Sequence, residues 1–331
     1  MLKIGLVGAG HLGKIHIKLL LSLPIWTLVG FHDTNEAVAT AVVQKWDIPH
    51  IEDIDTLIQQ VDALAIITPT PHHFDIAKKA IEQDKHVFIE KPLTQTLEQA
   101  EELLKLAKQH KIIGQVGHVE RFNPAYLAVR HKITNPLFIE THRLAQFNPR
   151  GTDVSVVLDL MIHDLDIILK SVDAPIVDVQ ASGVAIISQK PDIVNARLTF
   201  ANGCVANVTA SRLSMKNMRK MRLFQEDAYV SIDFLNKQAE VTKLSDQKDA
   251  VLPSFELNIG QENAKKYITF DIPEVLPLNA LQQELEEFAH SILEAKPVAV
   301  TLEDGYKALK LAHQISTQVQ QNLEKRKEFV S

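Results

Sequence analysis

The chain has 331 residues, of which 46% are hydrophobic and 23% are charged, and its net charge is −6. This length exceeds what a single hydrophobic core usually supports, so we expect two globular domains. The net negative charge argues against a nucleic-acid-binding protein, because such proteins neutralise phosphates with a basic surface.

Cysteine content and hydropathy exclude further classes of protein. Cys204 is the only cysteine, so neither an intrachain disulfide nor a cysteine-ligated zinc site is expected. The apolar start of the chain is interrupted by glycines and lacks a signal-peptide pattern, and no apolar run approaches ~18 residues. We therefore expect a cytoplasmic protein that does not bind membranes.

Residues 1–121 alternate short apolar runs with helical patterns, which predicts a Rossmann domain, an α/β fold with a doubly wound parallel sheet. Thr34 is the expected cap of the second helix, and Thr96 with Gln99 forms a capping-box pair before the fifth. The expected helices span residues 11–23, 35–45, 55–60, 71–85 and 97–111. Six strands are expected, at residues 3–7, 26–32, 49–51, 63–68, 86–90 and 112–119.

The pattern changes after Asn123, so we expect residues 122–331 to form an α+β domain for substrate binding and oligomerisation. Its strands predict a large, mostly antiparallel sheet with one open face, and Asn202-Gly203 is typical of a hairpin turn within it. An open apolar face needs a partner, so we expect a homodimer or homotetramer formed through this sheet. Helices are expected at residues 125–133, 155–170, 280–295 and 303–320. Strands are expected at residues 137–145, 177–187, 193–200, 204–211, 221–225, 228–234, 238–243 and 266–272.

A glycine-rich turn lies between the first predicted strand and the first predicted helix. Gly8 permits the tight turn, Gly10 lets a diphosphate approach the backbone, and Gly13 lets the helix pack closely on the strand. The helix N-terminus offers free N–H groups to phosphates. The turn therefore predicts a dinucleotide site, with His11 and Leu12 also at the cofactor. A turn that only connects the two elements is the alternative.

Asp33 follows Gly13 by twenty residues, at the end of the second predicted strand. A carboxylate at this position binds the ribose hydroxyls of adenosine and repels a 2′-phosphate. The residue therefore favours NAD over NADP as the cofactor, although the neighbouring His32 is compatible with a phosphate.

Lys91 follows the predicted strand at residues 86–90, at the carboxyl edge of the sheet, where open α/β sheets bind their ligands. An ammonium group there can hydrogen-bond a substrate hydroxyl and stabilise negative charge as the hydroxyl becomes a carbonyl. A surface lysine that ends a strand is the alternative.

Asp159 and His163 lie four residues apart in a predicted helix and so share one face. Oxidation of a carbinol needs a base that titrates near neutrality, and histidine meets this need. Asp159 would orient His163 or position a substrate hydroxyl. A core histidine beside solvated acids is the alternative. We expect no metal, because hydride transfer to NAD needs none.

Together these motifs resemble the Gfo/Idh/MocA oxidoreductase family, over essentially the whole chain. The resemblance implies an NAD(P)-dependent dehydrogenase that acts on CH–OH groups, with Lys91 and His163 as the catalytic pair and Asp159 lining the substrate site. The motifs that carry it are the glycine turn, Thr68-Pro69-Thr70 with His73, Glu90-Lys91-Pro92, and the spacing of Asp159 and His163.

The resemblance also implies where the cofactor binds. Thr68, Pro69, Thr70 and His73 would lie along the cofactor loop, and Glu90 would lie near the nicotinamide ribose. His72, beside His73, is expected to pack within the loop and not to bind a metal.

Residues 117–124 and 157–164 are similar to the branch of the family that acts on nucleotide-activated amino sugars. This implies a substrate like UDP-N-acetylglucosamine, oxidised at its C3 hydroxyl to a 3-keto sugar, with Arg121 and Asn123 among the residues that bind it. The chain lacks the glycine run that precedes the aspartate in many relatives and has the bulkier residues 154–158 there.

Two other functions stay open. One is an inositol or free-sugar dehydrogenase of the same family, and the other is a non-catalytic regulator that binds NAD. A basic cluster could contact a diphosphate, or it could belong to a solvated loop and edge strand. Its members are Arg212, Lys216, Arg219, Lys220 and Arg222.

Overall fold

The computed structural model describes residues 1–148, 154–188, 190–258 and 265–330. The chain forms two compact units, Met1–Arg121 with Asn279–Lys310, and Phe122–Leu278 with Leu311–Ser331. The first unit is therefore discontinuous in the sequence, whereas the sequence analysis placed every residue after 121 in the second domain. None of the helices in the described part of the chain is long and apolar enough to span a membrane.

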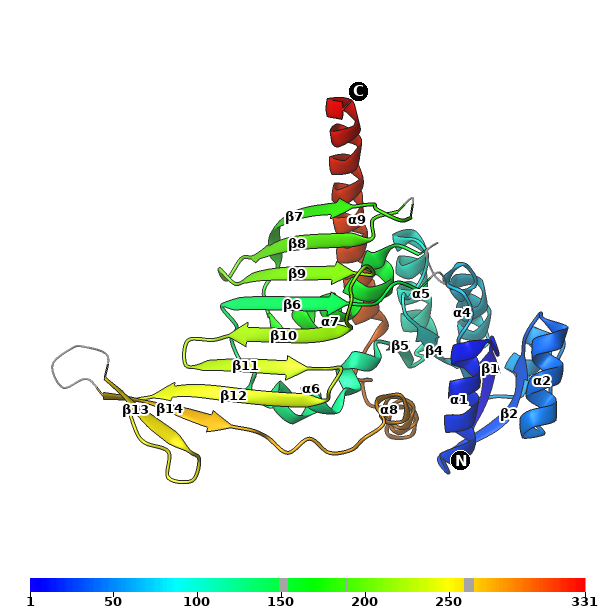
Figure 1. The fold of residues 1–331 in the computed structure, drawn as a ribbon. Helices are drawn as coiled ribbons and strands as arrows, with labels where there is room; N and C mark the ends of the chain where they lie inside the picture. Colours follow the sequence, from blue (N-terminus) through cyan, green and yellow to red (C-terminus); the bar gives the residue numbers. More distant parts are fainter. Residues whose placement is uncertain (149–153, 189, 259–264, 331) are drawn as a thin grey trace. The chain divides into compact units, whose positions relative to one another are not determined.

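The predicted parallel sheet of the first unit is confirmed, but it has five strands and not six, in the order β2-β1-β3-β4-β5 (Figure 1). The predicted strand at residues 49–51 is wrong, because His50 makes only a single bridge to Phe31. Residues 86–90 are therefore the fourth strand of the sheet and not the fifth. The strands are β1 (Leu2–Val7), β2 (Trp26–His32), β3 (Ala63–Ile66), β4 (His86–Glu90) and β5 (Gly114–Gly117).

Helices connect these strands and begin at caps that the sequence partly reveals. The capping box of Thr96 and Gln99 is confirmed at the start of α5. The predicted cap of α2 is wrong by one residue, because the side chain of Asn35, and not of Thr34, accepts the hydrogen bond from Val38 N–H. The helices are α1 (His11–Ser22), α2 (Glu36–Trp46), α3 (Ile54–Gln59), α4 (His73–Glu82) and α5 (Leu97–His110).

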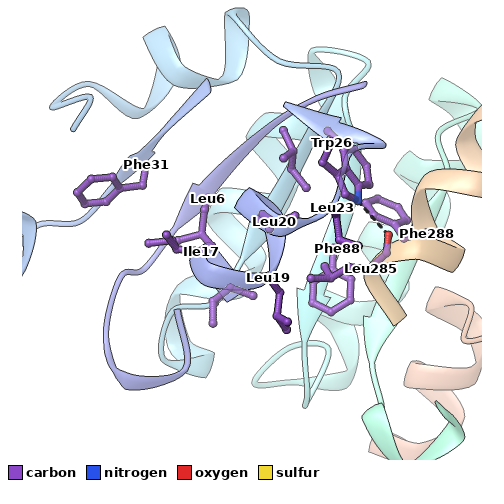
Figure 2. Close-up of a cluster of buried hydrophobic side chains, with 14 of the residues drawn as sticks. Leu6, Ile17, Leu19, Leu20, Leu23, Trp26, Phe31, Phe88, Leu285 and Phe288 are labelled. Atoms are coloured by element: carbon purple, nitrogen blue, oxygen red, sulfur yellow. Dashed lines mark hydrogen bonds between the residues drawn. The ribbon is translucent and has the colours of Figure 1, made fainter. Parts of the chain in front are cut away.

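The core of this unit includes residues from α8 (Ala280–Glu294), far along the chain. Phe288 packs against Phe88 of β4 and Trp26 of β2, with ring centroids 6.1 and 5.7 Å apart. The indole N–H of Trp26 donates a 3.0 Å hydrogen bond to the carbonyl oxygen of Leu285 (Figure 2). Burial of these large side chains stabilises the sheet and explains why α8 belongs to the first unit.

The edge of the sheet at β5 is also covered by a late segment of the chain. Val116 N–H donates to the carbonyl oxygen of Val300, and Gln115 forms a bridge with Thr301. This pairing leaves β5 without a free edge on that side, which protects the sheet from pairing with other chains.

The second unit contains a nine-stranded sheet with the order β13-β14-β12-β11-β10-β6-β9-β8-β7. All its strand pairs are antiparallel except β6 with β9, so the predicted mostly antiparallel sheet is confirmed. The strand β13 was not among the predicted strands. The strands are β6 (Phe138–Leu144), β7 (Ile176–Val184), β8 (Ile193–Phe200), β9 (Val205–Ser211), β10 (Met218–Phe224), β11 (Ala228–Asp233), β12 (Gln238–Ser245), β13 (Ser254–Asn258) and β14 (Lys265–Asp271).

Helices cover one face of this sheet (Figure 1). They are α6 (Pro124–Val129), α7 (Ile162–Ser171) and the part of α9 (Leu302–Val330) that follows Lys310. The alternation along β6 shows the two faces, because Ile139 and Arg143 are buried while Glu140 and His142 are partly exposed. The predicted hairpin is confirmed, since Gly203 has a φ of +86° between the paired strands β8 and β9.

Candidate functional site

The three glycines of the turn after β1 each have a separate structural reason. Gly8 has a φ of +92°, which favours glycine. A Cβ atom on Gly13 would lie 1.9 Å from the carbonyl oxygen of Gly8, so only glycine lets α1 approach the turn. A Cβ atom on Gly10 would meet nothing within 4 Å, so this backbone faces open space. The fold therefore requires Gly8 and Gly13, whereas Gly10 leaves room for a ligand.

Asp33 is hydrogen-bonded to this turn through its side chain. Its Oδ2 atom accepts a 2.7 Å hydrogen bond from Ala9 N–H, and its Oδ1 atom accepts one of 2.8 Å from Asn35 N–H. Both oxygens are thus held by main-chain donors at the carboxyl ends of β1 and β2. The carboxylate is fixed in place next to the glycine turn.

A cavity of about 510 Å³ opens beside Asp33 and fits the adenosine end of a dinucleotide in size and chemistry. Gly8, Gly10 and Asp33 line one part of it, and Thr68 and Pro69 from the loop after β3 line another. Open backbone at a helix N-terminus suits a diphosphate, and the carboxylate suits ribose hydroxyls. His72 also lines the cavity.

His73 is buried and connects the two loops that follow β3 and β4. Its Nε2 atom lies 2.8 Å from the carbonyl oxygen of Thr68, and its Nδ1 atom lies 2.9 Å from that of Pro92. Burial lowers the pKa of His73, and its contacts with these carbonyl oxygens offset this only in part. The buried His73 side chain therefore holds the loop after β3, the predicted cofactor loop, to the loop after β4. Thr70 begins the short 3-10 turn that precedes α4.

Lys91 follows β4 directly, at the carboxyl edge of the sheet where the sequence placed it. The carboxylate of the neighbouring Glu90 is buried, and its Oε2 atom accepts a 3.1 Å hydrogen bond from Lys91 N–H. The other oxygen of Glu90 lies 3.2 Å from Nε2 of His16. The main chain at Lys91 is therefore held by a carboxylate that is itself held by α1.

Asp159 and His163 belong to the second unit. The predicted helix at residues 155–170 begins as a π-helical segment, Val157–Met161, which contains Asp159. It continues as α7, which contains His163 in its first turn. Both side chains are partly exposed. A π-helical segment of this kind is often found at functional sites, because it redirects the side chains that follow.

A buried ion pair fixes the start of α7, and the sequence analysis did not identify it. Arg143 on β6 donates two hydrogen bonds to the Asp164 carboxylate, 3.0 Å from Nε and 2.8 Å from Nη2. The Arg143 guanidinium also lies over the Phe234 ring, 5.8 Å from its centroid. Because Asp164 follows His163, this pair positions the backbone of the predicted base. An arginine at an inward position of β6 was the available signal.

The two predicted substrate-binding residues near the domain boundary are both buried. Arg121 lies in a 3-10 helix, Val119–Phe122, and Asn123 caps α6 by accepting a hydrogen bond from Ala125 N–H. The Asn123 amide also donates to the carbonyl oxygen of Phe234. Asn123 thus has a structural role within the second unit.

The basic cluster does not form one continuous patch. Arg212 is buried, and its guanidinium donates to the carbonyl oxygen of Val154. Lys220 and Arg222 lie on the exposed face of β10, an interior strand of the sheet, and pair with Asp233 and Glu140. The predicted edge strand is therefore wrong for these two residues.

Two family models match this chain, one over the Rossmann domain and one over part of the second unit. Residues 2–118 match the family model described as the oxidoreductase family with an NAD-binding Rossmann fold. Residues 113–231 match the model of the GFO/IDH/MocA C-terminal domain. Together these matches cover more than half of the chain.

Individual relatives match over nearly the whole length. The chain is 33% identical over 325 residues to UDP-N-acetylglucosamine 3-dehydrogenase of Acidithiobacillus ferrooxidans, which covers 98% of this chain and 99% of that protein. A solved structure of that enzyme has a TM-score of 0.87 and covers 96% of this chain and 97% of its own. A structure of scyllo-inositol dehydrogenase from Lactobacillus casei with bound NAD(H) and scyllo-inositol has a TM-score of 0.77 at 22% identity, covering 97% and 98%. The last similarity shows the fold alone.

Proposed function

Since the chain belongs to the Gfo/Idh/MocA oxidoreductase family, we propose that it oxidises the C3 hydroxyl of a UDP-linked amino sugar such as UDP-N-acetylglucosamine. The product is a 3-keto sugar. The observation that carries this proposal is the similarity, over nearly the full length of both chains, to an enzyme named for that reaction.

The first unit supplies the cofactor site in this proposal. The turn at Gly8, Gly10 and Gly13 binds the diphosphate, and Asp33 binds the adenosine ribose. Because both Asp33 oxygens are fixed by main-chain N–H groups, the carboxylate stays where a 2′-phosphate would have to lie. We therefore infer a preference for NAD over NADP.

Lys91 and His163 carry the chemistry. His163 accepts the proton of the C3 hydroxyl, and the Lys91 ammonium stabilises the negative charge that develops on that oxygen. NAD, which the glycine turn and Asp33 would hold, would supply the acceptor for the hydride of C3, so that the net products would be a ketone, NADH and one proton. Asp159 orients the imidazole or holds a neighbouring hydroxyl. Because the two catalytic residues belong to different units, the proposal requires both to reach the same carbon.

The exposed face of the large sheet is the proposed interface between copies of this chain. Aromatic side chains of three adjacent strands contact one another there, with ring centroids 5.8 Å apart for Phe138 and Phe224 and 4.9 Å apart for Phe224 and Tyr229. Partly exposed aromatic rings beside a polar region are common at protein interfaces. We propose a homodimer or homotetramer, and light scattering on the purified protein tests this directly.

A substrate panel tests the proposed function. The protein is mixed with NAD and, in separate reactions, UDP-N-acetylglucosamine, N-acetylglucosamine and myo-inositol, while NADH absorbance is followed. We expect NADH with the UDP-sugar and inhibition of that reaction by UDP. Turnover of inositol or free sugars without inhibition by UDP would establish the alternative dehydrogenase. NAD binding without turnover of any sugar would favour the regulator.

A further inference from the structure

A buried histidine contacts the carboxylate beside the proposed catalytic lysine. His16 lies in α1 with no exposed surface, and its Nε2 atom is 3.2 Å from Oε1 of Glu90. The His16 ring also packs against Phe88 of β4, with centroids 5.6 Å apart. Neither the sequence motifs nor the proposed mechanism uses His16.

The hydrogen-bonding chemistry fixes the direction of this contact. A carboxylate only accepts hydrogen bonds, so the hydrogen of the imidazole lies on Nε2 of His16 and is donated to Glu90. Nδ1 of His16 has no hydrogen-bond partner within the described residues, which agrees with its carrying no hydrogen. The histidine therefore acts as a single, oriented donor to Glu90.

Glu90 is restrained on two further sides. Its Oε2 atom accepts a 3.1 Å hydrogen bond from Lys91 N–H. On another side lies Gly117 of β5, where a Cβ atom would come within 3.0 Å of the carboxylate carbon and of Oε2. A side chain at position 117 would therefore push the carboxylate by a few tenths of an ångström.

We propose that His16 and Glu90 are positioning residues for Lys91. His16 holds the Glu90 carboxylate, and the carboxylate holds the main chain at Lys91, so the ammonium is presented at a fixed place at the end of β4. This inference rests on the proposed catalytic role of Lys91. Misplacement of a catalytic group by about 1 Å can cost roughly 100-fold in rate, so a positioning chain of this kind has a measurable effect.

Two substitutions of His16 separate positioning from packing. Gln places an amide nitrogen close to the position of Nε2 and keeps the donor, whereas Leu keeps the bulk and removes it. We expect His16→Leu to lower kcat about 10- to 100-fold and His16→Gln to lower it less than about 5-fold. The dissociation constant of NADH, measured by fluorescence, should change less than about 3-fold in both.

Two further variants test the proposed contacts from His16 through Glu90 to Lys91, and whether a change elsewhere on β4 has the same effect on kcat. Gly117→Ala displaces the carboxylate without touching His16 and should lower kcat in the same way. His86 is the matched control, because it lies at the opposite end of β4 and its Nδ1 accepts a hydrogen bond from Ile113 N–H. His86→Leu should lower the melting temperature while leaving kcat unchanged.

A double-mutant cycle provides the decisive result. If His16 acts through Lys91, then adding His16→Leu to Lys91→Ala lowers the residual kcat less than about 2-fold further, because the positioned group is already absent. Additive losses, or equal losses in His16→Leu and His86→Leu, would overturn the positioning role. Full activity of Lys91→Ala alone would instead overturn the proposed function, so the two failures are distinguishable.

Discussion

The main-chain N–H of Ala9 donates a 2.7 Å hydrogen bond to the side-chain carboxylate of Asp33. This bond joins the glycine turn after β1 to the end of β2, so one residue both shapes the turn and faces the cavity. Asp33 therefore links the geometry of the turn to the cofactor preference that we propose.

Replacing Asp33 by Ser should shift the cofactor preference toward NADP. The variant removes the negative charge that opposes a 2′-phosphate, and it weakens the link to Ala9. We expect kcat/KM for NAD to fall about 10- to 100-fold and the ratio of NADP to NAD efficiency to rise by a similar factor. Asp62→Asn is the control, because Asp62 also accepts a main-chain hydrogen bond, from Lys3. An unchanged ratio in Asp33→Ser would refute the role of the carboxylate.

Substitutions of Gly10 and Gly13 should separate folding from cofactor binding. Gly13→Ala places a methyl group 1.9 Å from the Gly8 carbonyl oxygen, so both the melting temperature and NADH binding should fall. Gly10→Ala meets no protein atom within 4 Å, so the melting temperature should be nearly unchanged while NADH affinity falls at least about 10-fold. Normal NADH affinity in Gly10→Ala would show that no diphosphate binds there.

The Arg143–Asp164 pair should contribute strongly to the stability of the second unit. Removing one partner of a buried ion pair leaves an uncompensated charge, which typically costs about 3–5 kcal/mol. We expect Arg143→Met to lower the free energy of unfolding by about that amount. Arg222→Met is the control, because its pair with Glu140 joins β10 to β6 on the exposed face of the sheet and should cost less than about 1 kcal/mol. Denaturant unfolding measures the free energy of unfolding of both variants. Equal losses in Arg143→Met and Arg222→Met would contradict the stabilising role of the buried pair.

Asp192 should make stability depend on acid pH. Burial raises the pKa of Asp192, but hydrogen bonds from the backbone of Ile186, Ile187 and Ser188 and from the Ser188 hydroxyl outweigh it and lower the pKa to about 2. A folded-state pKa below the usual 3.8 means that the stabilisation is complete above about pH 4. It is lost as the pH falls toward 2.

The shift corresponds to about 2 kcal/mol. Asp192→Asn should therefore lower the free energy of unfolding by about that amount at pH 7, and the difference from the natural protein should narrow as the pH approaches 2. Urea unfolding at several pH values measures it. A difference that stays constant down to pH 3 would contradict the assignment. Asp249→Asn is the control for the buried position of Asp192, because Asp249 also accepts main-chain hydrogen bonds but lies at an exposed turn.

The Rossmann sheet was predictable because its strands and helices have strong local patterns. Residues 49–51 were mistaken for a strand because a short extended segment next to Pro49 has the same composition as an edge strand. The place of α8 in the first unit depends on contacts such as Trp26 with Leu285, 259 residues apart, which no local pattern contains. The same reason explains why the sequence did not decide the domain membership of residues 279–310. It does not explain the missed β13, which pairs only with the neighbouring β14.

The candidate site was predictable only in part. Motif spacing indicated the glycine turn and the loops after β3 and β4. The supporting contacts of His16 with Glu90 and of Arg143 with Asp164 join residues 74 and 21 positions apart, so no local motif contains either pair. The inward position of Arg143 on β6 was the only signal of the second. The π-helical segment at Val157–Met161 was expected as an ordinary helix, because both have the same apolar pattern.

Isotope transfer from the substrate tests the central claim most directly. UDP-N-acetylglucosamine carrying deuterium at C3 is incubated with NAD and the protein, and the cofactor and sugar are analysed by mass spectrometry. We predict one deuterium in each NADH formed and none left at C3 of the keto sugar. Reduced cofactor without deuterium, or a product that keeps the label at C3, would contradict oxidation at that carbon.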